Sequence, residues 1–224
     1  MNNDLILGGV MSLRTFEKLP ANKQEKILTE GIREFSLKSF RDASTDTIVE
    51  QCQISKGILF HYFGSKKKFY LYCLEKSMER LTGKTEEVIG NDFYEILFEE
   101  MNRKIRLCME YKDEMHMVNM SSRDASSEIA KEKAEIMVGY AVLIRSESEK
   151  MLRNAMDKLH LKSREDITAE GLQIYINAVM NRYLLQYQQD PDQFFENSET
   201  IRAQMKEYLD LMLYGICEKE EGHE

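Results

Sequence analysis

The stretch of the chain with the most suggestive chemistry is residues 55–63, where a lysine, a histidine and three aromatic residues lie close together. Ser55 is a good helix N-cap, and Leu59 and Phe63 are four residues apart, so both can face the core of a helical domain together with Ile54. The other side chains then face outward, which is unfavourable for large apolar groups unless a partner covers them. The outward positions are Lys56, Gly57, Ile58, Phe60, His61 and Tyr62.

These outward side chains suit the major groove of DNA. A lysine can donate to guanine O6 and N7, and an apolar side chain can contact a thymine methyl group. For His61 alone, a partly buried histidine with satisfied hydrogen bonds is the ordinary alternative. The segment as a whole favours a helix that meets the major groove.

Basic residues gather in the same part of the chain. Residues 51–74 contain four lysines and no acid, as expected of a surface that neutralises phosphates. Three of the lysines, Lys66, Lys67 and Lys68, fall in the first turn of a helix that Ser65 would cap. The helix macrodipole disfavours cations there, and a phosphate bound at that N-terminus would rationalise them. A solvated helix face is the simpler alternative.

The charge of the whole chain gives the opposite impression. Its 224 residues carry a formal net charge of −8, which argues against a nucleic-acid partner. Residues 14–69, however, hold 11 lysines and arginines against 7 acids, a net charge of +4, and the rest of the chain carries −12. An acidic body would be repelled by DNA, so that only the basic N-terminal part could dock.

The elements around this segment are predicted to be helices, because the chain has only two prolines and 11 glycines. Asn22 with Glu25 forms a capping-box pattern, which predicts a helix over residues 23–37. Ser44 is a good N-cap for a short second helix, and residues 53–54 form a turn before the segment described above. A packing helix followed by two short helices around a tight turn is a helix-turn-helix.

The stretch FRDASTDTIVEQCQISKGILFHYFGSKKKF, residues 40–69, resembles the helix-turn-helix of the TetR family of bacterial transcriptional regulators. The matching motifs are Ser-Lys-Gly, a leucine two residues on, His-Tyr-Phe, and Ser-Lys at the start of the next helix. The resemblance implies an all-α protein. It would have a three-helix DNA-binding domain over residues 12–66 and a helical ligand-binding and dimerisation domain over residues 67–224.

The resemblance also assigns contacts to single residues. It implies base reading by Lys56, Gly57 and Ile58 of the recognition helix. It implies contacts to phosphate or sugar by Ser44, Thr45, His61, Tyr62 and Lys66.

The chain departs from the family pattern at four positions. Gln53 replaces the usual turn glycine, so that a residue with a side chain must adopt the left-handed conformation or the turn must differ. Phe60, on the same DNA-binding face, lacks the hydroxyl of the tyrosine that is common there. Ile58 replaces a small polar residue, and Asp46 puts an acid at the DNA-facing end of the second helix.

Beyond residue 84 the pattern predicts long helices. They are expected over residues 92–111 with an extension to 117, and over 127–159, 166–188 and 199–216, with a loop at 119–124. Residues 208–216 are apolar nearly all round, which indicates burial on two sides, against the protomer's own core and against a second subunit. We expect a four-helix-bundle homodimer interface formed by Ile174, Ala178, Met205, Leu209, Met212, Leu213 and Ile216.

Methionine and aromatic residues are dense between the N-terminal part and this interface. Ordinary core packing explains most of them, but an adaptable apolar pocket would use the same residue types. The resemblance implies that a small molecule binds there and shifts the two DNA-binding parts out of register. The residues expected to line the pocket are Phe98, Met101, Met117, Met137, Tyr140, Ile144 and Tyr175.

Other classes of protein find little support. The four cysteines have no CxxC spacing, no segment is apolar enough to span a bilayer, and no secretory signal pattern is present, so we expect a cytoplasmic protein without cofactor or metal. No catalytic constellation stands out, and the chain is not expected to be an enzyme.

The sequence therefore predicts a homodimeric repressor that binds a palindromic double-stranded operator and is released by a small apolar or amphipathic effector. One alternative is a regulator that responds to a protein partner or that activates transcription. The other is an all-α metal-binding or small-molecule-binding enzyme built on two histidines that each follow an aspartate by one helical turn. Those pairs are Asp113 with His116 and Asp157 with His160.

Overall fold

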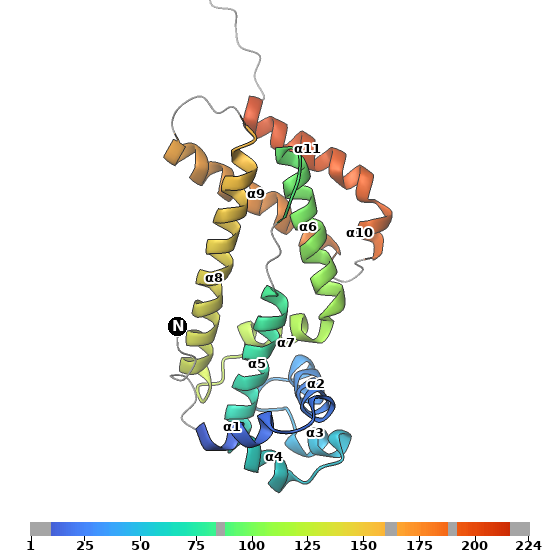
Figure 1. Ribbon diagram of the computed structural model, residues 1–224, viewed down its shortest axis with the longest axis vertical. Coiled ribbons are helices and arrows are strands. Elements are labelled where there is room, and N and C mark those ends of the chain that lie inside the picture. Colours follow the sequence, from blue (N-terminus) through green and yellow to red (C-terminus); the bar gives the residue numbers. More distant parts are fainter. Residues whose placement is uncertain (1–9, 84–87, 160–164, 188–191, 216–224) are drawn as a thin grey trace, which may run out of the picture. The chain divides into compact units, whose positions relative to one another are not determined.

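The computed structural model describes residues 10–83, 88–159, 165–187 and 192–215, and these form eleven helices and no strand (Figure 1). The all-α prediction is confirmed. The helices are α1 (Val10–Glu17), α2 (Ala21–Leu37), α3 (Thr45–Cys52), α4 (Lys56–Phe63), α5 (Lys66–Thr82), α6 (Phe93–Glu110), α7 (Lys112–Arg123), α8 (Ala130–Met156), α9 (Glu165–Tyr187), α10 (Asp192–Glu196) and α11 (Ser198–Tyr214).

The chain divides into two compact units. The head unit lies within residues 1–84 and 111–144, and the body unit within residues 85–110 and 145–224. The head unit therefore continues past residue 66, the expected end of the DNA-binding domain, because α5, α7 and the first half of α8 pack with the N-terminal helices. In Figure 1, α3 and α4 lie beside each other next to the start of α5.

The core of the head unit forms where α2 crosses α5. Apolar residues of α2 recur at helical spacing and are buried, among them Ile32 and Phe35. The Phe35 ring meets the rings of Phe69 and Tyr70 edge-on. Gly31 allows this close approach, since a Cβ at that position would lie 2.5 Å from the Phe69 ring.

Serine side chains begin the three helices after α2, as the sequence predicts. Ser44, Ser55 and Ser65 each accept a hydrogen bond from the amide three residues later. The capping box predicted at Asn22 is wrong. α2 begins at Ala21, two residues before the predicted start, and its N-cap is Pro20, whose carbonyl accepts the first helical hydrogen bonds. The Glu25 carboxylate instead pairs with Arg80 of α5.

The helix predicted to extend to residue 117 is broken at Tyr111, whose backbone (φ −114°, ψ 51°) is not helical and which precedes α7. The loop predicted at residues 119–124 is also wrong, since α7 runs through Arg123. Burial of its Met117 and Ser121 side chains against the head core outweighs the polar character of these residues. α1 and α10 were not predicted from the sequence pattern.

The body unit has a core of its own, built from apolar faces of α6, α9, α10 and α11. Phe98 of α6 stacks with Phe194 of α10, and Met205 and Leu209 of α11 are buried beside them. The bounds predicted for α9 and α11 agree with the structure to within two residues where the chain is described. Among the described helices, none combines the length and the apolar character that crossing a bilayer requires.

Candidate nucleic-acid interface

α4 presents the two faces that its sequence predicts. Leu59 and Phe63 are fully buried in the head core, and Ile54 packs against it. Lys56, Gly57 and His61 are exposed on the other side. Ile58 is exposed to 41%, and the Phe60 ring is half-buried. The helix therefore offers a short ridge of mixed basic and apolar groups to a partner.

Gly57 is a position where the protein's own packing does not require glycine. The nearest heavy atom to a Cβ placed there would be Ser55 Oγ at 3.8 Å, which is an ordinary contact distance. An alanine would favour the helix by about 0.5–1 kcal/mol. A surface that must approach this backbone closely from outside gives a reason for the missing side chain.

The turn between α3 and α4 is closed by Gln53 in the left-handed conformation, with φ 57° and ψ 42°. Its amide donates to the Glu50 carbonyl, and the Ile54 amide donates to the Val49 carbonyl, both at 3.0 Å. Of the two alternatives that the sequence left open, the structure shows the first, in which Gln53 itself adopts the left-handed conformation. The turn therefore forms with glutamine in place of the glycine of the family pattern, and it fixes α4 relative to α3.

Of the two residues expected to bind phosphate at the start of α3, only Ser44 keeps accessible surface. Thr45 is buried, on the inner side of α3, whereas Thr47, about half a turn later, is exposed. The Ser44 amide donates to the buried Glu34 carboxylate at 2.7 Å, which holds the start of α3 against α2.

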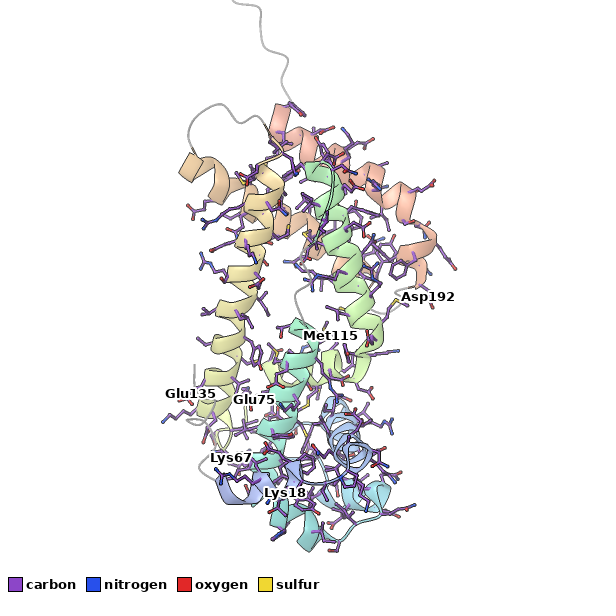
Figure 2. The ribbon with its side chains drawn as sticks, viewed as in Figure 1. Lys18, Lys67, Glu75, Met115, Glu135 and Asp192 are labelled. Carbon is purple, nitrogen blue, oxygen red and sulfur yellow. The ribbon has the colours of Figure 1, made fainter. Side chains whose placement is uncertain are left out.

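The lysines at the start of α5 have partners inside the head unit. Lys66 Nζ donates to the Arg41 carbonyl at 3.1 Å and lies 5.0 Å from the centre of the Phe40 ring. Burial lowers the pKa of Lys66, although nearby carboxylates oppose the shift. Lys67 Nζ lies 2.6 Å from Glu132 Oε1 of α8 (Lys67 is labelled in Figure 2).

The stretch that lacks acids in sequence is therefore not free of acids in space. Glu132 reaches Lys67 from α8, and Asp46 of α3 reaches Lys56, with 2.9 Å between Oδ2 and Nζ. Asp46 lies ten residues before Lys56, and Glu132 lies on α8, so the count over residues 51–74 includes neither acid. The fold supplies a second reason for lysines in the first turn of α5, namely anchoring the α2–α3 connection and α8.

Tyr62 is held by a helix that the sequence analysis missed. Its ring is half-buried and lies 5.8 Å from the ring of Phe16 in α1, centre to centre. Phe16 is buried and also contacts Phe63. The spacing of Leu13 and Phe16, three residues apart, is the signal that could have indicated α1. Arg14, on the same helix, is exposed.

The junction of α7 and α8 holds the connection that precedes α3. Asp124 Oδ2 accepts a hydrogen bond from the Phe40 amide at 2.6 Å, and Oδ1 accepts one from the Ser126 amide at 2.8 Å. Burial tends to raise the pKa of the Asp124 carboxyl, but these hydrogen bonds hold it below its usual value. Lys133 in turn donates to the carbonyls of Ser121 and Asp124 at the end of α7.

Comparison with known proteins relates the N-terminal part of the chain to one family of regulators. Residues 27–73, which include α3 and α4, match the family model of bacterial regulatory proteins of the tetR family. The HTH-type transcriptional regulator YerO of Bacillus subtilis is 25% identical over 166 residues, which cover 72% of this chain and 55% of YerO. The HTH-type transcriptional repressor AcnR of Corynebacterium efficiens is 30% identical over 87 residues, which cover 39% of this chain and 44% of AcnR. Residues 27–73 therefore resemble the regulators of the TetR family.

The chain spans about half the length of these curated relatives. Among solved structures, the transcriptional regulator FadR of Bacillus subtilis in complex with stearoyl-CoA matches with a TM-score of 0.54 and 14% identity. The match covers 86% of this chain and 99% of that one. A likeness at this identity concerns the fold alone.

The residues expected to line an effector pocket are divided between the two units. Met117, Met137, Tyr140 and Ile144 belong to the head unit, and Phe98, Met101 and Tyr175 belong to the body unit. Met101 and Met117 are fully buried in the core of their own unit, whereas Ile144 is exposed. The Tyr175 hydroxyl donates to the Tyr208 carbonyl at 2.7 Å.

The residues expected at the dimer interface fall into two groups. Met205 and Leu209 are buried in the body unit's own core, because they lie on the inner face of α11. Ile174 (66%) and Ala178 are exposed on α9. Met212 and Leu213 are half-buried, and Ile216 lies outside the described residues. Two further apolar residues of α11, Leu211 and Tyr214, are exposed and were missed by the sequence analysis.

The aspartate–histidine pairs gain no further ligands where they are described. Asp113 lies 3.7 Å from Arg33 in an ion pair, and His160 falls outside the described residues. Within the ranges that the structure covers, no three side chains of the types that bind metals come together.

Proposed function

We propose that the chain is a transcriptional regulator of the TetR family, a homodimeric repressor that binds a palindromic operator and is released from it by a small apolar or amphipathic effector. The observation that carries the proposal is the outer face of α4, where Lys56, Gly57 and Ile58 are exposed on a helix whose other face is buried. Residues 12–66 form the DNA-binding domain in this proposal, and the rest binds the effector and the second subunit.

The chemistry of this face suits a major groove. The Lys56 ammonium can donate to guanine O6 and N7, and the Ile58 side chain can cover a thymine methyl group. Gly57 lets the helix backbone approach the groove closely, while Ser44 and His61 lie at positions suited to phosphate contacts. Phosphate contacts position the helix, and base contacts select the sequence.

Substitution of Gly57 separates this role from folding. Gly57→Ala should stabilise the helix by about 0.5–1 kcal/mol, because alanine loses less backbone entropy on folding. The same change should weaken DNA binding about tenfold or more, since a methyl group then occupies the closest point of approach. Thermal unfolding and fluorescence anisotropy with a labelled duplex measure the two effects.

A matched control is Gly139→Ala, at an exposed site of α8 where no heavy atom lies within 4 Å of a new Cβ. It should stabilise the fold similarly and leave DNA binding unchanged. Lys56→Ala should lower the preference for a selected sequence by about 1–3 kcal/mol. Wild-type DNA affinity in both Gly57→Ala and Lys56→Ala would contradict the proposal.

Exposed apolar groups on α9 and α11 support the homodimer. Ile174 and Ala178 of α9, with Leu211 and Tyr214 of α11, are exposed on the body unit's surface. Such groups are unfavourable in water unless a second surface covers them. A symmetric dimer would present two copies of α4 about one turn of DNA apart.

The effector of the proposed repressor belongs to the class of apolar or amphipathic small molecules. Stearoyl-CoA, which is bound in the structure of the Bacillus subtilis relative FadR, is a member of that class. The effector must bind the conformation that does not bind DNA more tightly than the one that does, since only differential affinity shifts the equilibrium.

A further inference from the structure

Asp46 is an acid on the face of the head unit that the proposed function turns toward DNA. It lies in the first turn of α3, and its side chain is 72% exposed. Its Oδ2 is 2.9 Å from Nζ of Lys56, in the first turn of α4, whose side chain is 47% exposed. A carboxylate at this place repels phosphates and so opposes binding to DNA in general.

The fold gives one reason for an acid here, since the helix macrodipole favours a carboxylate in the first turn of α3, but that reason does not require a contact with Lys56. An ion pair between two such exposed side chains adds little to stability. The N-terminus of α3 is already capped by Ser44, whose side chain accepts from the Thr47 amide. The effect of Asp46 that matters for function is therefore its effect on how Lys56 binds a ligand.

We propose that Asp46 is a specificity-determining residue, which withholds the charge of Lys56 from phosphates while leaving it able to read a base. This inference rests on the proposed function and deepens it. A lysine ammonium has three N–H donors, so one can stay on Asp46 while the others reach guanine O6 and N7. A phosphate near Lys56 meets the negative charge of Asp46, whereas the edge of a neutral base does not.

The ion pair should thus lower non-specific affinity more than operator affinity. Each phosphate that a protein neutralises releases counterions, and it adds about 0.9 to the slope of log affinity against log salt concentration. While Lys56 is paired with Asp46, it adds little to that slope. Without the acid, Lys56 becomes an ordinary phosphate contact.

The test compares wild type with Asp46→Asn, which keeps the shape and removes the charge. Two labelled duplexes serve as probes, one of random sequence and one that the wild type enriches most strongly from a random library. Affinities are measured by fluorescence anisotropy between about 50 and 200 mM salt, a range over which phosphate contacts dominate the change. Asp46→Asn should bind the random duplex several-fold more tightly, with a slope steeper by about 0.9. The enriched duplex should gain less, so that the specificity ratio falls.

The matched control is Glu50→Gln, which removes one negative charge from an exposed position of the same helix. It should leave the slope unchanged. Equal effects of the two variants, or an unchanged slope in Asp46→Asn, would overturn the inference, since general charge or no effect at all would then explain the data. Asp46→Ser should reproduce Asp46→Asn, and adding Lys56→Ala to either should abolish the gain.

The same experiment separates this inference from the proposed function. A wild type that binds neither duplex at any salt concentration would refute both. A wild type that binds and discriminates, with variants that keep its slope and its specificity ratio, would refute only the role of Asp46.

Discussion

At the scale of single residues, Gln53 adopts a backbone conformation that favours glycine, and the turn between α3 and α4 still forms. A side chain in the left-handed conformation costs roughly 1–2 kcal/mol, yet Gln53 adopts it at the turn between α3 and α4. Two backbone hydrogen bonds close the turn, and the buried residues of the two helices on either side hold it. The substitution therefore affects stability without altering the turn that positions α4.

Gln53→Gly should stabilise the head unit by about 0.5–1 kcal/mol, because the relief of steric strain exceeds the larger entropy that glycine loses on folding. Gln51→Gly, two residues earlier and exposed within α3, should destabilise it by about 1 kcal/mol. Urea unfolding followed by circular dichroism measures both changes. A loss of stability in Gln53→Gly similar to that in Gln51→Gly would contradict the role assigned to the turn.

Residues whose role depends on their neighbours in the chain could be predicted from the sequence. The caps Ser44, Ser55 and Ser65 and the buried pair Leu59 and Phe63 are of this kind, since helix geometry sets their surroundings. The partners of Lys56, Lys66 and Lys67 could not be predicted, because they lie on other elements. These lysines make the sequence locally basic, but in the fold each of them contacts a group on another element.

At the scale of elements, α7 is tied to α2 and α5 through Arg80. The Arg80 guanidinium lies 2.5 Å from Glu114 of α7 and 2.7 Å from Glu25 of α2. Burial tends to lower the pKa of Arg80, but the hydrogen bonds from it to Glu114 and Glu25 raise the pKa overall. Glu114 is buried, and loss of Arg80 would leave its carboxylate without this ion pair.

Arg80→Met should destabilise the head unit by about 3 kcal/mol, because it leaves the Glu114 carboxylate buried without its partner. Glu114→Gln in the Arg80→Met background should recover part of the loss, since it removes the unpaired charge. Lys76→Met, which breaks an ion pair with Glu79 within α5, should cost about 0.5 kcal/mol or less. Urea unfolding compares the three proteins, and equal effects of Arg80→Met and Lys76→Met would contradict a structural role for the Arg80 pairs.

The extent of α7 illustrates what an element's sequence leaves open. Polar residues at 119–124 indicate a loop, and nothing local marks the break at Tyr111. Tertiary burial of Met117 and Ser121 decides both, because one face of α7 covers the head core. Long helices with apolar residues at helical spacing, such as α2 and α11, were predicted nearly to their ends.

At the scale of the whole molecule, the uneven charge of the chain agrees with the structure of its head unit. The net charge of +4 over residues 14–69 falls on α1–α4 and the start of α5, which carry the proposed DNA-binding face. The remaining −12 disfavours other orientations on DNA. Asp46 of α3 and Glu132 of α8 nevertheless pair with lysines of this part of the chain, and we expect these acids to change its affinity for DNA.

The central claim, that α4 of a symmetric dimer reads DNA, is tested most directly by enrichment of duplexes from a random-sequence library with the purified wild-type protein. The account predicts an inverted repeat whose half-sites lie about 10–10.5 base pairs, or a multiple of that, from centre to centre. Under the same conditions Gly57→Ala should enrich it poorly. A library from which the wild type enriches no sequence would contradict the claim.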